Sequence, residues 1–355
     1  MAVVNTHLSI AMTADPFLPV PPLQYGGIER VIQFLADGLV ERGHRVVLFA
    51  HRDSKVRADL VPYPTDQNQS VVDIARNAAT IGSTILRGRY DIVHSFGRLN
   101  YLVPLALTST PKIMSYQRPI TPRSIGQANR VFGTSITFTA CSRRMIEPVK
   151  SLGDWRVVHN GVPLDAYVFQ RHVDATAPLV FLGRFDPEKG AHLAIEVAKR
   201  AGRRIVLAGN VPAKRAYFEE MVRPLIDDDR VRYIGPVDDR AKNELLGGAA
   251  ALLMPILWEE PFGIVMAEAL ACGTPVIGFG RGSVPEVVRH GVTGFVANDV
   301  EGLVEGVAAL ERLDRQNCRR EAEARFSDRV IVDQYEAIYF ERCRIAGQTP
   351  AARTA

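Results

Sequence analysis

Cysteine is scarce in this sequence of 355 residues. Four occur, and none are paired at the spacing of metal ligands: Cys141, Cys272, Cys318 and Cys343. Disulfide-stabilised secreted domains are dense in cysteine, and zinc modules carry it in closely spaced pairs. The sequence therefore excludes both classes, and we expect reduced, structural thiols in a cytosolic protein.

Long hydrophobic runs are also missing. The longest, Ala249–Trp258, is interrupted by Pro255 and is too short to span a bilayer, which takes about 20 apolar residues. The N-terminus lacks a basic stretch followed by an apolar core and a small-residue cleavage site, so we expect no signal peptide. We expect a cytoplasmic protein whose contact with a membrane, if it has one, is peripheral.

The charge is unevenly distributed, although the net charge is only +4. The segment between positions 112 and 156 contains eight basic residues and only two acidic ones, Glu147 and Asp154. The segment is either a solvated surface or a binding surface for an anionic acceptor or anionic lipid headgroups. No aromatic interleaving accompanies the charge, so we do not expect a nucleic-acid partner. The basic residues are Lys112, Arg118, Arg123, Arg130, Arg143, Arg144, Lys150 and Arg156.

Short apolar segments typical of strands alternate with segments of helical periodicity. This alternation begins near the N-terminus and begins again in the second half of the chain. The pattern predicts an α/β fold with two parallel sheets, each wrapped by helices, joined by a linker at 160–177. Expected strands of the first half are 8–13, 45–50, 91–95, 112–115, 136–140 and 156–159, and those of the second half are 179–182, 204–208, 231–234, 250–254 and 275–279. A last helix, 328–344, carries an apolar stripe that needs a surface to cover it.

Two cations follow the first strand of the second half. Arg184 and Lys189 lie in the segment LGRFDPEKG, between that strand and the next helix. Ligands of open parallel sheets bind outside the carboxyl ends of strands, and cations beside a helix N-terminus suit a diphosphate. The alternative is a solvated surface turn.

Two carboxylates follow in the segment WEEPFGIVMAEALACG. Glu260 precedes Pro261, which can start a helix, and Glu268 lies about 12 Å further along if the intervening residues are helical. Carboxylates accept hydrogen bonds from vicinal hydroxyl groups, so one could hold a sugar and the other a ribose. Apolar neighbours surround Glu268 in the sequence, and a buried carboxylate needs partners.

Glycine-rich turns occur at two further strand ends. Backbone N–H groups at Gly280–Ser283 could cradle phosphate oxygens, although a plain strand–helix turn is the better interpretation of this segment taken alone. Gly26 and Gly27 open the first helix, where the backbone can approach a ligand closely. The spacing is not G-x-G-x-x-G, so a dinucleotide-binding fingerprint is excluded.

These motifs occur in the order and spacing found in GT-B glycosyltransferases of family 4, which the chain resembles over nearly all its length. The pair of glutamates with seven residues between them is the most specific feature. The resemblance implies an α/β GT-B fold, with two Rossmann-like domains facing an inter-domain cleft. It implies an acceptor-binding domain at 1–165, on which helix 328–345 packs back, and a donor-binding domain at 166–327.

The resemblance also implies a retaining, metal-independent reaction with a nucleotide-diphosphate sugar as donor substrate and no cofactor. Arg184 and Lys189 would hold the diphosphate, Glu260 the donor sugar, and Glu268 the ribose. Phe262, Gly263 and Ile264 would contact the donor through the start of the helix, and Gly26 and Gly27 would approach the diphosphate. No carboxylate is placed as a covalent nucleophile, so attack on the same face, assisted by the leaving phosphate, is expected.

One position departs from the family pattern. Gln117 stands where family members commonly carry histidine, and glutamine cannot titrate. We place Gln117 and Arg118 on the acceptor side. His94, near another strand end, is either structural or on the acceptor side.

Two alternatives remain open, and one motif is set aside. The same fold could serve a sugar-nucleotide epimerase or a glycoside phosphorylase, or a non-catalytic partner that binds nucleotide sugars. Asp227 and Asp229 form an Asp-x-Asp pattern, but they lie between a proline-broken helix and a strand, so we predict an exposed loop and no metal site. Asp238–Asp239 is predicted to start a helix.

Overall fold

A computed structural model describes residues 7–22, 26–66 and 70–347 of the chain. It divides into two compact units. The N-terminal unit comprises the chain up to His159 together with the segment from Asp328 onward, and the C-terminal unit comprises Asn160–Ser327. Each unit is described by itself below.

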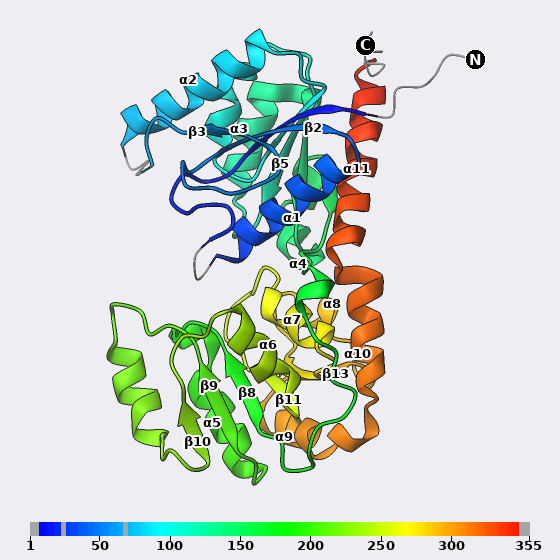
Figure 1. Ribbon diagram of the computed structural model, residues 1–355. Helices are drawn as coiled ribbons and strands as arrows, with labels where there is room; N and C mark the ends of the chain where they lie inside the picture. Colours follow the sequence, from blue (N-terminus) through cyan, green and yellow to red (C-terminus); the bar gives the residue numbers. More distant parts are fainter. Residues whose placement is uncertain (1–6, 23–25, 67–69, 348–355) are drawn as a thin grey trace, which may run out of the picture. The chain divides into compact units, whose positions relative to one another are not determined.

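The N-terminal unit is built on a parallel sheet of seven strands in the order β3-β2-β1-β4-β5-β6-β7 (Figure 1). The strands are β1 Ser9–Thr13, β2 Arg45–Ala50, β3 Asp59–Pro62, β4 Ile92–Ser95, β5 Lys112–Tyr116, β6 Ile136–Ala140 and β7 Trp155–Val157. The helices are α1 Gly27–Glu41, α2 Val71–Arg87, α3 Pro122–Phe132, α4 Arg143–Ile146 and α11 Asp328–Ile345. The central strands are buried along their length, as expected for a parallel sheet covered on both faces.

The C-terminal unit repeats this plan with six parallel strands in the order β10-β9-β8-β11-β12-β13. Its strands are β8 Leu179–Leu182, β9 Ile205–Ala208, β10 Val231–Tyr233, β11 Ala251–Met254, β12 Val276–Phe279 and β13 Gly294–Ala297. Its helices are α5 Ala191–Arg200, α6 Asp239–Gly247, α7 Ile264–Ala271, α8 Val284–Val287, α9 Val300–Ala308 and α10 Arg315–Glu321. The predicted α/β class with two doubly wound parallel sheets is confirmed.

The strand order reverses once in each sheet. In the N-terminal unit the reversal lies between β1 and β4, and in the C-terminal unit it lies between β8 and β11. Chain segments that leave the two strands at such a point turn to opposite faces of the sheet, which opens a crevice outside the carboxyl ends of the strands. The predicted donor-binding segments follow β8 and β11, so the fold brings them to one such point.

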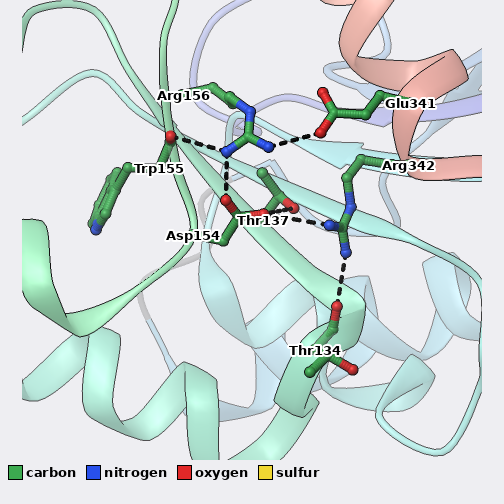
Figure 2. Close-up of polar contacts among 7 residues, drawn as sticks. All are labelled: Thr134, Thr137, Asp154, Trp155, Arg156, Glu341 and Arg342. Carbon is green, nitrogen blue, oxygen red and sulfur yellow. Dashed lines mark hydrogen bonds and ion pairs between the residues drawn. The ribbon is translucent and has the colours of Figure 1, made fainter. Parts of the chain in front are cut away.

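The last helix, α11, belongs to the N-terminal unit, where it contacts α1. It buries Val332, Tyr335, Ile338 and Tyr339, four residues of the predicted apolar stripe. Its C-terminal end is fixed by polar contacts to the edge of the sheet (Figure 2). Arg342 donates to the Thr134 carbonyl oxygen at 2.7 Å and lies 3.3 Å from Asp154, while Arg156 donates to Glu341 at 2.7 Å.

Caps that are visible in the sequence explain several helix starts. Ser70 forms a capping box with Asp73 at the start of α2, and Thr121 caps α3. Asp238 accepts the Ala241 N–H at 2.8 Å, so the helix start predicted at Asp238–Asp239 is confirmed. None of the helices in the described ranges is long and apolar enough to cross a bilayer.

Candidate active site

Lys189 is positioned by the turn that follows β8. Gly190 directly after it has φ of +71°, and a Cβ at this position would lie 2.1 Å from the Pro255 carbonyl oxygen. Only glycine permits this close approach between the turn after β8 and the turn after β11. The same junction is fixed by the Leu257 N–H, which donates to the Glu188 carbonyl oxygen at 2.7 Å.

The ammonium group of Lys189 contacts the carboxylate of Glu260 directly. The indole N–H of Trp258 donates to the same carboxylate oxygen at 2.8 Å, and the Lys189 nitrogen lies 4.9 Å from the centre of the indole ring. Glu260 has 8% of its surface exposed, and its side chain is therefore held in one place. The structure thus brings together two of the predicted site residues, one from each side of the β8/β11 junction.

The glycine-rich turn after β12 supports Glu260 and does not offer free N–H groups. Gly282 has φ of +53°, and a Cβ there would lie 2.3 Å from the Glu260 nitrogen. The Ser283 N–H donates to the Glu260 carbonyl oxygen at 3.0 Å, and its hydroxyl donates to the Phe262 carbonyl oxygen at 2.7 Å. The N–H groups of Gly280, Arg281 and Gly282 are bonded within the protein as well. The suggested phosphate cradle is therefore wrong. The N–H groups of this turn form hydrogen bonds within the protein, and the turn holds the backbone of Glu260 in position.

Helix α7 starts at Ile264, three residues later than Pro261, so the segment between the two glutamates is only partly helical. Gly263 precedes it with φ of +70°. Gly263 and Ile264 are half-buried, and the first N–H groups of a helix have no partner within the helix. Phe262 is instead buried against Phe326, with ring centres 5.7 Å apart. The helix start can therefore meet an anion through its backbone, while the Phe262 ring serves the core.

Glu268 lies in the second turn of α7 and is 5% exposed. The Tyr167 hydroxyl donates to its Oε1 at 2.7 Å, and the Lys242 ammonium donates to the same oxygen at 2.5 Å. Burial, followed by the charge of Glu268, holds the pKa of Tyr167 well above its usual range. The partners that a buried carboxylate requires are thus present.

Arg184 is less constrained than the other predicted donor residues. Its guanidinium group pairs with Asp186 at 2.5 Å, and its side chain is 46% exposed. Neither Lys189 nor Glu260 is among its partners in the described part of the chain. Because nearly half of this side chain is exposed, a ligand at the carboxyl ends of the strands could compete with Asp186 for the guanidinium group.

In the N-terminal unit, Gly26 and Gly27 mark the start of α1, where Gly26 provides no side-chain cap. A Cβ on Gly26 would lie 2.7 Å from Pro22 and 2.8 Å from a Glu29 carboxylate oxygen, which explains the glycine by close packing. Gln117 is half-buried after β5, and Arg118 is exposed and lies 3.8 Å from Asp15.

His94 is part of the core and is not available to an acceptor. It is fully buried, with Nδ1 bonded to the Tyr339 hydroxyl and Nε2 to the Ser115 hydroxyl, each at 2.6 Å. Burial lowers the pKa of His94 to about 3, so the ring is neutral at physiological pH. The acceptor-side assignment of His94 is therefore corrected to the structural alternative, in which it joins β4 to α11 and β5.

The basic segment is not one continuous solvated face. Lys112 is buried and donates to the Thr108 and Thr110 carbonyl oxygens at 2.9 and 2.8 Å. Arg156 pairs with Asp154 and Glu341 (Figure 2). Exposed cations remain on α3, on α4 and on the short helix Glu147–Leu152. Within the described ranges three of them have no ion pair: Arg123, Arg130 and Lys150.

The carboxylate of Asp227 accepts hydrogen bonds from backbone N–H groups of its own loop. One oxygen accepts the N–H groups of Asp229, Arg230 and Val231 at 3.1, 2.8 and 2.8 Å. These backbone donors lower the pKa of the exposed Asp227 carboxyl. Over residues 7–22, 26–66 and 70–347, no group of three His, Cys, Asp or Glu side chains is arranged to hold a metal ion.

Three residues of the site were not predicted from the sequence: Trp258, Tyr167 and Lys242. Trp258 stands two residues before Glu260, so its proximity could have been noticed. Tyr167 and Lys242 are 101 and 26 residues from Glu268, and only the folded chain brings them together.

Two known families match the sequence in consecutive blocks. Residues 25–166 match Glycosyltransferase Family 4, and residues 170–325 match Glycosyl transferases group 1. The chain is 27% identical to N-acetyl-alpha-D-glucosaminyl L-malate synthase of Bacillus anthracis, over 90% of this chain and 95% of the relative. It is 23% identical to spore coat protein SA of Bacillus subtilis, over 94% and 99% of the two chains.

Solved structures show the same fold. AviGT4, a glycosyltransferase involved in avilamycin A biosynthesis, superimposes with a TM-score of 0.73 at 27% identity, over 95% of this chain and 98% of the other. The Anabaena protein HepE, solved in complex with UDP and glucose, superimposes with a TM-score of 0.72 at 20% identity, over 94% and 100%. The fold is α/β of the GT-B type, and the chain belongs to the group 1, family 4 type of glycosyltransferases.

Proposed function

We propose that this glycosyltransferase takes its sugar from a nucleoside-diphosphate sugar bound at the β8/β11 junction. One observation carries the proposal: Lys189 and Glu260 meet at this junction, beside the half-buried start of α7. The ammonium group and the helix N-terminus offer positive charge to a diphosphate, and the carboxylate offers hydrogen-bond acceptors to sugar hydroxyl groups. The complex of HepE with UDP and glucose supports this choice of donor class.

Four of the predicted residues have a role in this proposal. Lys189 and Arg184 bind the diphosphate and stabilise the negative charge that develops as it leaves, which is where fixed cations lower the barrier most. Glu260 binds the hydroxyl groups of the transferred sugar. Glu268, oriented by Tyr167 and Lys242, binds the ribose.

We further propose that the anomeric configuration is retained. The bond between the anomeric carbon and the phosphate oxygen breaks, and a bond from the same carbon to the acceptor oxygen forms on the same face. The acceptor proton passes to an oxygen of the leaving phosphate. No metal ion or cofactor is required, because protein cations and backbone N–H groups supply the positive charge.

We also propose that the acceptor is presented at an anionic surface. Arg123, Arg130 and Lys150 form no ion pair within the described ranges; Arg130 directly precedes the exposed Val131, and Lys150 stands two residues before the exposed Leu152. Basic residues near an anionic membrane surface contribute about 1 kcal/mol each. Flotation with vesicles containing phosphatidylglycerol should recover the protein at low salt and lose it at high salt. Equal recovery with neutral vesicles would contradict this part of the proposal.

Transfer is tested by incubating the protein with UDP-, GDP- and ADP-sugars and a panel of hydroxyl-bearing acceptors. We expect release of the nucleoside diphosphate that depends on the acceptor, and a product with the anomeric configuration of the donor by NMR. Release that requires inorganic phosphate would indicate a phosphorylase, and isomerisation of the donor without an acceptor would indicate an epimerase. Binding of a nucleoside diphosphate with no turnover across the panel would indicate a non-catalytic binding protein.

A further inference from the structure

Trp258 contacts both members of the Lys189–Glu260 ion pair, although the proposed reaction gives it no role. Its indole N–H donates to Glu260 Oε2 at 2.8 Å, and the Lys189 ammonium contacts the same oxygen. The Lys189 nitrogen also lies 4.9 Å from the centre of the indole ring, a distance at which the face of tryptophan attracts a cation. The indole therefore adjoins the two groups on which the proposed donor site depends.

The backbone around Trp258 is fixed by other groups. The Leu257 N–H donates to the Glu188 carbonyl oxygen at 2.7 Å, and the Leu257 carbonyl oxygen accepts from the Arg281 guanidinium at 3.1 Å. On the other side of Trp258, the turn after β12 donates an N–H to the Glu260 carbonyl oxygen at 3.0 Å. The conformation of this segment thus does not depend on the indole.

The indole ring of Trp258 is also not part of the hydrophobic core. Trp258 is half-buried, and within the described ranges its ring packs against no other aromatic ring. The second tryptophan of the chain, Trp155, packs instead against Tyr116 and Phe138, with ring centres 5.9 and 5.0 Å away, and donates to the Val149 carbonyl oxygen at 3.2 Å. Trp155 therefore serves packing, whereas the polar contacts of Trp258 go to functional groups.

A bound donor would act differently on the two partners of Glu260 Oε2. Lys189 carries a full charge on a flexible stem, so a diphosphate draws it away, whereas the indole N–H is neutral and is held on a rigid ring. Among the described residues, Trp258 is then the remaining side-chain partner of the Glu260 carboxylate, which is 8% exposed and needs one. No described residue donates a hydrogen bond to Glu260 Oε1, so this oxygen stays available to a sugar hydroxyl group.

We propose that Trp258 is a positioning residue of the transfer reaction, whose indole N–H holds Glu260 Oε2 while Lys189 binds the diphosphate. Glu260 Oε1 then stays in place for a hydroxyl group of the donor sugar. The inference rests on the proposed function, because it adds a residue to the same site. Trp258 acts through Glu260 and does not bind the diphosphate, so its loss affects use of the sugar and not binding of the nucleoside diphosphate.

The test compares transfer kinetics with nucleotide binding in Trp258→Phe, which keeps an aromatic ring beside Lys189 and removes the N–H. We expect kcat/KM for the nucleotide sugar to fall about tenfold or more, because a hydrogen bond to a charged group is lost. Calorimetric affinity for whichever of UDP, GDP and ADP binds should stay within about twofold of wild type, which also shows that the variant is folded. Trp155→Phe is the matched control and should keep both wild-type values.

A double-mutant cycle shows whether Trp258 acts through Glu260. Trp258→Phe is introduced into the wild type and into Glu260→Ala, and kcat/KM is measured for all four proteins. In Glu260→Ala there is no carboxylate to position, so the second change should cost less than about a further twofold. Losses that multiply in the double variant would overturn the inference, since Trp258 would then act independently of Glu260.

The same measurements separate this inference from the proposed function. Wild-type kcat/KM in Trp258→Phe, or a fall in kcat/KM and in nucleotide affinity by the same factor, would overturn the inference and leave the proposed donor site standing. A wild-type protein that binds no nucleoside diphosphate and releases none from a nucleotide sugar would contradict the proposed function, and the inference with it.

Discussion

Lys189 contacts Glu260 across the junction between β8 and β11, although the two residues are 71 positions apart in the sequence. In the absence of a donor, each is the other's counter-ion. A bound diphosphate would become the new partner of Lys189, and a sugar hydroxyl the new partner of Glu260. The ion pair therefore stabilises two charged groups until the donor binds. Without it, each would be a largely buried charge that lacks a counter-ion.

Gly282→Ala should lower the rate of transfer although the residue bears no functional group. A Cβ would lie 2.3 Å from the Glu260 nitrogen and 2.4 Å from its carbonyl oxygen, so the backbone at Glu260 must shift. A displacement of about 1 Å at a reacting group can cost about a hundredfold in rate. Steady-state kinetics should show this loss in kcat/KM. Gly202→Ala is the control, since it also has a positive φ but meets no neighbouring atoms, and it should leave the rate near that of wild type.

Glu268→Ala should lower activity by about a hundredfold by removing the proposed ribose contact and leaving Lys242 without its main partner. Hydrogen bonds to charged groups contribute about 1.5–3 kcal/mol each. The loss should be found in kcat/KM measured with varied nucleotide sugar, with a folded protein by circular dichroism. Glu244→Ala, an exposed glutamate on α6, is the control. Near-normal kinetics in Glu268→Ala would count against its role.

His94 should make the N-terminal unit sensitive to acid. Burial gives His94 a folded-state pKa of about 3, which lies below the usual histidine pKa of 6.5, so the unfolded state binds the proton first. Stability is then fully present above pH 6.5 and is lost as the pH falls from there toward 3. From pH 7 to pH 5 this one group should cost about 2 kcal/mol in the free energy of unfolding.

The acid sensitivity is measured by urea denaturation of wild type and His94→Gln at both pH values, with hydrogen exchange of β1 and β4 peptides as the local readout. The variant should lose less stability between pH 7 and pH 5 than the wild type. His7→Gln is the matched control, because it removes an exposed imidazole and leaves the buried His94 in place. An equal acid dependence in His94→Gln and wild type would contradict the assignment.

Treatment with EDTA should leave the transfer rate unchanged. In the proposed site, positive charge comes from Lys189, Arg184 and the start of α7. Initial rates are measured after dialysis against EDTA and again after Mg²⁺ or Mn²⁺ is added back. Loss of activity that the metal restores would show that the protein cations are insufficient.

The sequence was a good guide to the buried strands and a poorer one to short elements near the sheet edges. Strands such as β8 and β11 are continuous apolar runs, and such runs predict buried parallel strands. β3, an edge strand with exposed ends, and β13, a short strand ended by polar residues, lack this signal and were missed. Helix α2 was also missed, although Ser70 and Asp73 form a capping box that the sequence contains.

The site was predictable where the residues form local motifs. Lys189 and Glu260 stand in short segments in which glycine and proline mark turns, and the sheet topology brings these segments together. The role of Gly282 could not be deduced, because its neighbour Glu260 comes from a different strand end. The role of His94 was left open for the same reason, since its hydrogen-bond partner on α11, Tyr339, is 245 residues away along the chain.

The central claim is that Lys189 binds the diphosphate of the donor, and calorimetric titration of UDP, GDP and ADP tests it directly. We predict that at least one of these nucleotides binds the wild type and that Lys189→Ala weakens this binding by about a hundredfold, by roughly 2.7 kcal/mol or more. Lys199→Ala, an exposed lysine at the end of α5, should bind as the wild type does. Equal affinity in Lys189→Ala and Lys199→Ala would contradict the account.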